Sequence, residues 1–221
     1  MFWYILLYII FFIPSRLLYP TRVLNKQNMP KKRAILSCNH LSMIDPVYIA
    51  IYSRRKAHFF AKKELAKNRF LRFLVPAVGS VFVERGEADI AAVKKVLQIL
   101  KKDKILMIFP EGTRNKTGED IQELKTGAVT FAVKTDTPVI PVIVWRRPKA
   151  FRRNFIYYGK PISFAQYKDV KMSHAEKAEA TAVLTEKMAE AKRELRDYLL
   201  KKRPRLLKRH EAKQAGENKN K

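Results

Sequence analysis

The sequence predicts an α/β fold in which a mostly parallel sheet is flanked by helices. Short apolar runs bounded by turn-forming residues, such as 34–38 and 139–145, alternate with segments whose apolar residues have helical spacing, such as 86–102. Strands that alternate with helices favour this layered architecture, because each helix returns the chain to the start of the next parallel strand. The 221 residues, 47% of them hydrophobic, are enough for one core domain with appendages and argue against disorder.

The N-terminal segment, 1–24, is predicted to be a membrane anchor. Its first thirteen residues, MFWYILLYIIFFI, carry no charged side chain. A helix of that length covers roughly 20 Å, less than the roughly 30 Å hydrocarbon core of a bilayer. We therefore expect it to enter one leaflet or to span marginally, with Arg16 and Arg22 at the headgroups. A helix packed on its own domain is the alternative.

The predicted core domain, 25–200, begins with a polar linker over 25–33. Strands are expected over 34–38, 58–61, 78–83, 105–109, 139–145 and 155–158. Helices are expected over 46–52, 63–75, 86–102 and 124–133. The first helix follows a capping-box pattern, Ser42-x-x-Asp45, with Pro46 at its first position, and the second is expected to end before Pro76. Pro141 cannot donate a ladder hydrogen bond, so its strand is expected to be an edge or irregular strand that shapes a pocket wall.

The C-terminal third predicts one long amphipathic helix. A second capping box, Ser173-x-x-Glu176, precedes an apolar stripe of Leu184, Met188, Ala191, Leu195 and Leu199. Residues 201–221, which include KKRPRLLKR, are expected to form a basic tail that is solvated or binds a surface.

The net charge limits the kinds of binding partner, and the cysteine content limits the kinds of disulfide and metal site. A formal net charge of +26 implies an anionic partner, which is nucleic acid, an anionic membrane surface or a phosphorylated substrate. The basic residues are spread over the chain without a nucleic-acid motif, so nucleic acid is the least favoured of these. A basic loop, predicted to face an anionic bilayer or to be merely solvated, contains Arg146, Arg147, Lys149, Arg152 and Arg153. The single Cys38 excludes an internal disulfide and a cysteine-rich zinc site, and fits a reducing compartment.

His40 lies where a strand ends and a loop leads to a helix, which is where α/β proteins keep their chemistry. An imidazole there can accept a proton near neutral pH, and the carboxylate of Asp45 can fix its tautomer. In the alternative interpretation Asp45 caps the helix and His40 is an ordinary loop residue. Cys38, a competing nucleophile, falls in strand phase and is expected to be buried.

Two further strand ends carry arginines. VFVERG places Arg85 after one strand, and FPEGTR places Arg114 after another, so both are expected at one edge of a parallel sheet. Gly112 permits a tight turn, from which Glu111, Thr113 and Arg114 are expected to project. Paired guanidinium groups suit a phosphate, and Lys125 would extend this basic rim. Each motif taken alone is typical of a surface turn.

Taken in order, NHLSMID, VFVERG, FPEGTR and VIPV resemble the four motifs of the glycerolipid acyltransferase family, over about 34–165. The most similar branch is that of the bacterial 1-acyl-sn-glycerol-3-phosphate acyltransferases. The resemblance implies that 25–200 is an acyltransferase domain. It also implies transfer of a fatty acyl group from acyl-CoA or acyl carrier protein to lysophosphatidic acid, giving phosphatidic acid in phospholipid biosynthesis.

The same resemblance implies roles for particular residues. His40 would be the general base and Asp45 its orienting partner. The acceptor-phosphate region would comprise Arg85, Glu111, Gly112, Thr113 and Arg114. No metal or redox cofactor is expected, and the chain is expected at the cytoplasmic face of the cell membrane.

Two other functions stay open on the sequence. One is an acyltransferase for another lyso-lipid acceptor, and the other is a non-catalytic basic protein that binds membranes or nucleic acid. The tail beyond Lys201 is longer and more basic than catalysis demands, and the resemblance assigns it no role.

Overall fold

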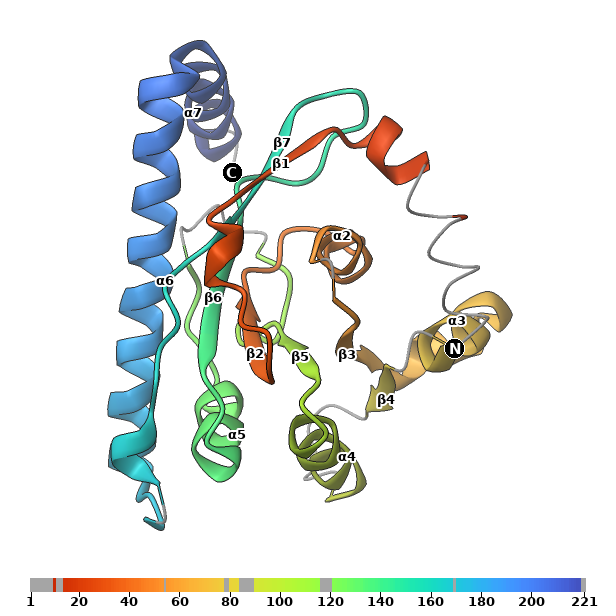
Figure 1. The fold of residues 1–221 in the computed structure, drawn as a ribbon. Coiled ribbons are helices and arrows are strands. Elements are labelled where there is room, and N and C mark those ends of the chain that lie inside the picture. Colours follow the sequence, from red (N-terminus) through yellow and green to blue (C-terminus); the bar gives the residue numbers. More distant parts are fainter. Residues whose placement is uncertain are drawn as a thin grey trace.

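The computed structural model describes residue 10 and residues 14–53, 55–77, 80–83, 90–115, 121–168 and 170–219. Within these residues one seven-stranded sheet runs in the order β1-β7-β6-β2-β5-β3-β4 (Figure 1). Its strands are β1 (Thr21–Leu24), β2 (Ala34–Cys38), β3 (Ala57–Lys62), β4 (Val81–Val83), β5 (Ile105–Ile108), β6 (Val139–Val144) and β7 (Asn154–Tyr158). Neighbouring strands are parallel except β6 and β7, which are antiparallel. The predicted α/β fold with a mostly parallel sheet is confirmed.

Helices cover both faces of the sheet (Figure 1). They are α2 (Asp45–Tyr52), α3 (Arg69–Ala77), α4 (Ile90–Lys101), α5 (Gly127–Thr135), α6 (His174–Lys202) and α7 (Pro204–Lys219), with short 3₁₀ turns at Lys26–Asn28, Lys63–Lys67 and Ala165–Tyr167. Buried side chains of α4, α5, α6 and α7 form a core with Ile35, whereas α2 and α3 pack on the face that carries Leu36 and Cys38. This alternation along β2 follows from the two-residue period of a strand.

The start of α2 differs from the predicted capping box. Ser42 donates its backbone N–H to Asp45 Oδ2 at 2.6 Å, which is one half of such a box. The other half is missing, because Asp45 donates its backbone N–H to the carbonyl of Ser42 at 3.2 Å and Ile44 occupies the N-cap position. The Asp45 carboxylate thus closes the loop before the helix, while Pro46 stands in the first turn.

The helix predicted over 63–75 forms as two pieces. The 3₁₀ turn Lys63–Lys67 is separated from α3 by Asn68, a residue type that favours N-cap positions. Helix α3 also continues through Pro76 to Ala77, so the expected end before the proline is wrong. Pro76 has no N–H to donate to the carbonyl four residues earlier, so α3 continues through it without that hydrogen bond.

Strand β6 lies inside the sheet, between β7 and β2, so the expectation of an edge strand at Pro141 is wrong and that of an irregular strand is right. Val142 pairs with Tyr158, and Val139 pairs with Ile162, so that residues 140–141 face residues 159–161 across a bulge. The carbonyl of Pro141 accepts the N–H of Gly159 at 2.8 Å. A proline is tolerated at such a bulge because the regular ladder is already interrupted there.

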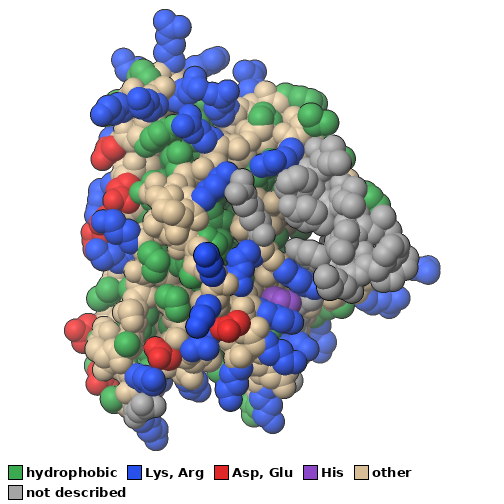
Figure 2. Space-filling model, in the orientation of Figure 1, with side chains coloured by type: hydrophobic (Ala, Val, Ile, Leu, Met, Phe, Trp, Pro, Cys, Tyr) green, Lys and Arg blue, Asp and Glu red, His purple; other side chains and the backbone are tan. Residues whose placement is uncertain are grey.

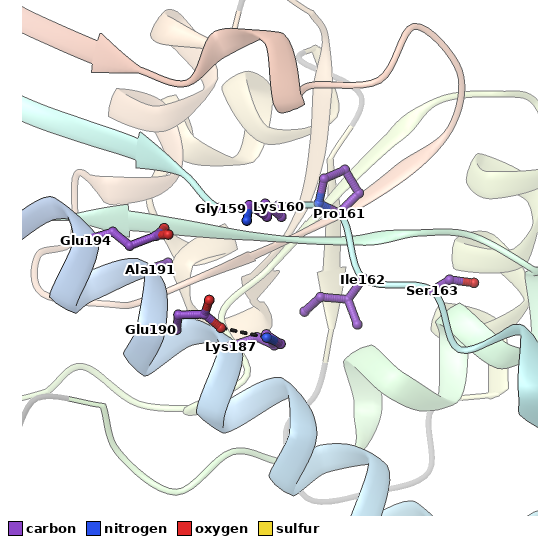
Figure 3. Close-up of a pocket in the computed structure, with 9 residues that line it drawn as sticks. All are labelled: Gly159, Lys160, Pro161, Ile162, Ser163, Lys187, Glu190, Ala191 and Glu194. Atoms are coloured by element: carbon purple, nitrogen blue, oxygen red, sulfur yellow. Dashed lines mark hydrogen bonds and ion pairs between the residues drawn. The ribbon is translucent and has the colours of Figure 1, made fainter.

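Gly159 lets α6 pack closely on this bulge. A Cβ atom on Gly159 would lie 3.0 Å from Pro141 Cβ and 3.2 Å from Ala191 Cβ of α6. Beside this contact, a pocket of about 340 Å³ separates the 159–163 segment from Lys187, Glu190 and Glu194 of α6 (Figure 3).

We expect Gly159→Ala to lower the free energy of unfolding by about 1–3 kcal/mol, because the added methyl group overpacks the contact between α6 and the sheet. Urea denaturation followed by circular dichroism measures this. Gly127→Ala is the matched control, because a Cβ there would meet nothing within 4 Å, and its unfolding free energy should stay the same or rise by up to about 1 kcal/mol. Equal stability of both variants and the unsubstituted chain would show that the contact carries no constraint.

The long amphipathic helix that the C-terminal third predicted is α6. The side chain of Ser173 accepts the N–H of Glu176, the Glu176 side chain accepts the N–H of Ser173, and all five predicted stripe residues are buried.

The basic segment after α6, expected to be solvated or to bind a surface, is helical and is partly packed on the domain. Most of it forms α7, in which Leu207 is only 1% exposed. The His210 ring lies 5.4 Å from that of Trp145, and Arg196 of α6 pairs with Glu211 at 2.9 Å. Leu207 and His210 supply the apolar and aromatic contacts that hold this basic segment on the domain.

The predicted anchor divides in two. Residues 21–24 form β1 and pair with β7, so this part belongs to the sheet. Residues 1–9 and 11–13 lie outside the described residues. In the described part of the chain, no helix combines the length and the apolar character that crossing a bilayer requires. Residues 25–33, expected as a linker, lie against the sheet, where Asn28 donates to the carbonyl of Tyr158 at 3.0 Å.

Candidate active site

The ends of β2, β5 and β6 place three loops at one edge of the sheet. These strands are parallel, with Ser37 opposite Ile108 and Cys38 opposite Val142, so their carboxyl ends coincide. The loops after them are 39–44, 109–126 and 145–153. In open α/β sheets this edge is where ligands bind.

His40 and Asp45 face each other across the first of these loops. His40 Nδ1 lies 3.1 Å from Asp45 Oδ2, and the backbone N–H groups of Leu41 and Ser42 donate to the same oxygen at 2.6 Å. The Asp45 side chain is fully buried, whereas the His40 side chain is 13% exposed. Asp45 thus closes the loop and lies within hydrogen-bond distance of the imidazole, so the predicted proximity of the two side chains is observed. Because Nδ1 faces the carboxylate, Nε2 is the ring nitrogen left to exchange a proton with a substrate.

The loop after β5 clamps the backbone of His40. Glu111 Oε1 accepts the His40 N–H at 3.0 Å, and the His40 carbonyl accepts the Asn115 N–H at 2.7 Å. The His40 ring also lies 4.5 Å from that of Phe109. Glu111 is 5% exposed, so it points inward and does not project from the turn as expected. The side chain therefore positions the histidine backbone.

Two asparagines in this site carried no prediction. Asn39 extends β2 by exchanging hydrogen bonds with the backbone of Val144, at 3.0 and 2.8 Å. Asn115, 6% exposed, supplies the N–H that binds His40. The signal for Asn39 was a polar residue directly after a wholly buried strand, where an amide can replace a missing strand partner.

Burial raises the pKa of Glu111, while N–H donors from His40 and Gln122 and electrostatic interactions with His40 and Lys192 act in the opposite direction. The pKa is therefore higher in the folded chain than its ordinary value of 4.5 in the unfolded chain. Between these two values the folded chain binds more protons, so its stability falls as the pH rises through that window.

We expect the unfolding free energy of Glu111→Gln, relative to the unsubstituted chain, to increase as the pH rises above about 4.5, by at most about 1.4 kcal/mol per pH unit. The glutamine carbonyl can still accept the His40 N–H, but the variant has no carboxyl group to ionise. Chemical denaturation of both proteins from pH 4 to pH 8 measures the difference. A difference that does not change with pH would contradict the raised pKa.

The turn after Glu111 presents polar and basic groups. Gly112 has φ 71°, in the left-handed region that favours glycine. A Cβ on Gly112 would lie 2.8 Å from Lys125 Cε, so the lysine side chain lies over the turn. Thr113 and Arg114 are exposed. Lys125 is held by its backbone N–H, which donates to the carbonyl of Pro110 at 2.9 Å.

The structure thus brings together His40, Asp45, Glu111, Gly112 and Lys125, and it places Thr113 and Arg114 on the same loop. The predicted Arg85 lies outside the described residues. Cys38 is fully buried, as expected, and burial raises the pKa of its thiol. A buried thiol of raised pKa is a poor nucleophile.

Comparison with known proteins gives consistent results. The family model described as Acyltransferase matches residues 20–145, more than half of the chain. The chain is similar to the 1-acyl-sn-glycerol-3-phosphate acyltransferase of Bacillus subtilis, with 28% identity over 80% of this chain and 89% of that protein. It is similar to the protein of the same name from Borreliella burgdorferi, with 30% identity over 61% of this chain and 55% of that protein.

A solved structure is also similar. It is the crystal structure of the 1-acyl-sn-glycerophosphate (LPA) acyltransferase PlsC from Thermotoga maritima, with a TM-score of 0.60 and 25% identity over 83% of this chain and 73% of that chain. The match of the family model includes the loop of His40 and Asp45 and the turn of Gly112. This chain belongs to the acyltransferase family.

Proposed function

We propose that this acyltransferase moves a fatty acyl group from a thioester donor to the sn-2 hydroxyl of lysophosphatidic acid and so makes phosphatidic acid. The observation that carries the proposal is the His40–Asp45 pair at 3.1 Å, beside a turn that bears Arg114 and is overlain by Lys125. The names of the relatives from Bacillus subtilis and Borreliella burgdorferi support the same acceptor.

The proposed chemistry follows from the order of groups at the site. His40 Nε2 accepts the proton of the lipid hydroxyl as its oxygen attacks the thioester carbonyl. The tetrahedral intermediate then collapses, the carbon–sulfur bond breaks, and the His40 imidazolium returns the proton to the leaving thiolate. Asp45 holds the ring and stabilises the imidazolium. General-base assistance of this kind contributes about 10²–10⁴ in rate.

The acceptor phosphate is assigned to the basic turn. The guanidinium of Arg114 and the ammonium of Lys125 are charges suited to a phosphate, and the family resemblance adds Arg85. Glu111 does not bind the phosphate in this proposal. Its carboxylate accepts the backbone N–H of His40 and so connects the turn to the His40 loop. The step needs no metal or redox group, because the thioester is already activated.

The donor and the location are part of the proposal. Acyl-CoA and acyl carrier protein both present an acyl thioester to the attacking hydroxyl. We place the protein at the cytoplasmic face of the cell membrane, with the apolar segment 1–13 in the bilayer.

The acceptor is tested with purified protein, one acyl-CoA and three detergent-solubilised acceptors, with release of free thiol as the readout. The acceptors are lysophosphatidic acid, monoacylglycerol and lysophosphatidylcholine. We expect thiol release at least about tenfold faster with lysophosphatidic acid, because one charged hydrogen-bonded contact to the phosphate contributes about 1.5–3 kcal/mol. Equal rates with monoacylglycerol would reject the phosphate assignment, and no release with any acceptor from either acyl-CoA or an acylated carrier protein would favour a non-catalytic binding protein.

A further inference from the structure

The β6–β7 loop exposes an aromatic side chain at the same edge as His40. Phe151 in this loop is 76% exposed and has φ 55°, a backbone conformation that bulky residues rarely adopt. Neither feature is favourable for folding in water. Phe151 therefore carries two local conflicts at one position, and such conflicts concentrate where a residue has a role outside the folded core.

The loop is built to hold that conformation. Asn154, 2% exposed, binds both sides of it, because its Oδ1 accepts the Lys149 N–H at 3.0 Å and its Nδ2 donates to the carbonyls of Lys149 and Arg152 at 3.0 and 2.8 Å. The N–H of Phe151 donates to the carbonyl of Leu18 at 2.5 Å. These bonds fix the loop at its base and at its tip.

The bond to Leu18 brings a second segment to the loop. Leu17 is 73% exposed and Leu18 is 39% exposed. Leu17, Leu18 and Phe151 are thus exposed apolar residues on two segments that are joined by this hydrogen bond, and we name them the interfacial patch. Residues 14–18 and the β6–β7 loop meet at the upper edge of the sheet in Figure 1, where α7 also lies.

Exposed basic side chains lie in the same loop as Phe151 and in the hollow next to it. Those exposed in the β6–β7 loop are Arg147, Lys149, Arg152 and Arg153. Next to them, a hollow of about 490 Å³ at the junction of α6 and α7 is lined by Arg153, Lys202, Arg203, Pro204, Arg205 and Leu206. Figure 2 shows blue side chains gathered along this upper edge, with green apolar side chains among them. A small apolar tip within a basic rim is typical of surfaces that lie in the interface of an anionic bilayer.

We propose that the interfacial patch dips into the headgroup and acyl boundary of an anionic membrane, with Phe151 as its tip. The basic rim would then lie at the phosphates, and the His40 edge would face the layer that supplies lipid. This inference rests on the proposed function in one respect, which is that a lipid substrate gives the His40 edge a reason to face the membrane. An acidic protein would match the basic rim, but a leucine pair and a phenylalanine at the tip match hydrocarbon.

The insertion is tested directly with a probe at the tip. In the full chain Phe151→Cys is labelled with an environment-sensitive fluorophore, because the native Cys38 is fully buried. Mixing with vesicles of phosphatidylcholine and phosphatidylglycerol should shift the emission to the blue, and brominated lipids should quench it. Val170→Cys is the matched control, since Val170 is 52% exposed and precedes the far end of α6.

We expect a shift and quenching at position 151 and neither at position 170, with a weaker response on vesicles of phosphatidylcholine alone. No response at position 151, or equal responses at both positions, would overturn the proposal. A response to acyl carrier protein without one to vesicles would also overturn it, in favour of a protein partner. This readout does not need turnover, so it remains valid if the proposed activity fails.

A second variant connects the patch to activity. Aspartate adopts a positive φ more readily than phenylalanine, so Phe151→Asp is expected to fold. Its rate of acyl transfer to lysophosphatidic acid in anionic vesicles should fall by about tenfold, because an apolar tip is replaced by a charge. Its rate on detergent-solubilised lysophosphatidic acid should be unchanged, as should both rates of Val170→Asp. Equal vesicle rates for Phe151→Asp and the unsubstituted chain would contradict the proposed insertion.

Discussion

Replacing His40 by alanine is expected to lower the turnover number for acyl transfer by about 10²–10⁴, because the lipid hydroxyl then loses its proton acceptor. The fold should persist. The hydrogen bonds that position residue 40 use its backbone N–H and carbonyl, with Glu111 Oε1 at 3.0 Å and the Asn115 N–H at 2.7 Å. An alanine keeps both of them. Thiol release from acyl-CoA with saturating lysophosphatidic acid measures the loss.

The matched control is His174→Ala, since His174 is an exposed histidine at the first position of α6. Its turnover should equal that of the unsubstituted chain. If His40→Ala keeps its turnover while it melts at the normal temperature, the general-base role of His40 is rejected.

Asp45→Asn should lower the turnover number by a similar factor, about 10²–10⁴, with little change in the KM for the lipid. The amide oxygen can still accept from Leu41 and Ser42, but it carries no charge to stabilise the imidazolium. We also expect the free energy of unfolding to fall by about 1–3 kcal/mol, because the new NH₂ group takes the place of the buried Oδ1, which has no hydrogen-bond partner among the described residues.

Turnover measured well below the melting temperature of Asp45→Asn separates the loss of catalysis from the loss of stability. Asp136→Asn is a control with the same change in chemistry, because Asp136 pairs with Lys168 at the surface, with side chains 45% and 53% exposed. It should leave both turnover and stability nearly unchanged. Normal turnover in Asp45→Asn would mean that the carboxylate only closes the loop before α2.

The proximity of His40 and Asp45 was predictable because the two residues are close in the sequence. Only four residues lie between His40 and Asp45, and the signals around them, a buried strand before and a proline after, also act over short range. The inward direction of Glu111 was not predictable in this way. Its partner is the backbone of His40, 71 residues earlier, and only the pairing of β2 with β5 brings the two together. From the turn motif alone, without tertiary contacts, all of its polar side chains are expected to be exposed.

The same distinction explains the wrong expectations for residues 21–24 and for Pro141, and it explains why the packing of the C-terminal segment was not foreseen. Residues 21–24 fit the end of an anchor, with Arg22 at the headgroups, but β7 gives them a strand partner more than 130 residues away. Pro141 favours an edge strand because it has no N–H to donate. The bulge that tolerates it involves residues 159–161, which follow the neighbouring strand β7. The packing of the basic segment 204–211 was not predictable from its own residues. Trp145 contacts His210, and the core residues of α6 contact Leu207.

The central claim is that the lipid hydroxyl attacks the thioester directly, with His40 as the base. The most direct measurement mixes the purified protein with acyl-CoA alone, follows thiol release and the intact protein mass, and then adds lysophosphatidic acid. We expect no burst of thiol and no gain in protein mass before the lipid is added, and afterwards one thiol for each phosphatidic acid formed. A stoichiometric burst with an acylated protein, before any acceptor is present, would contradict the account.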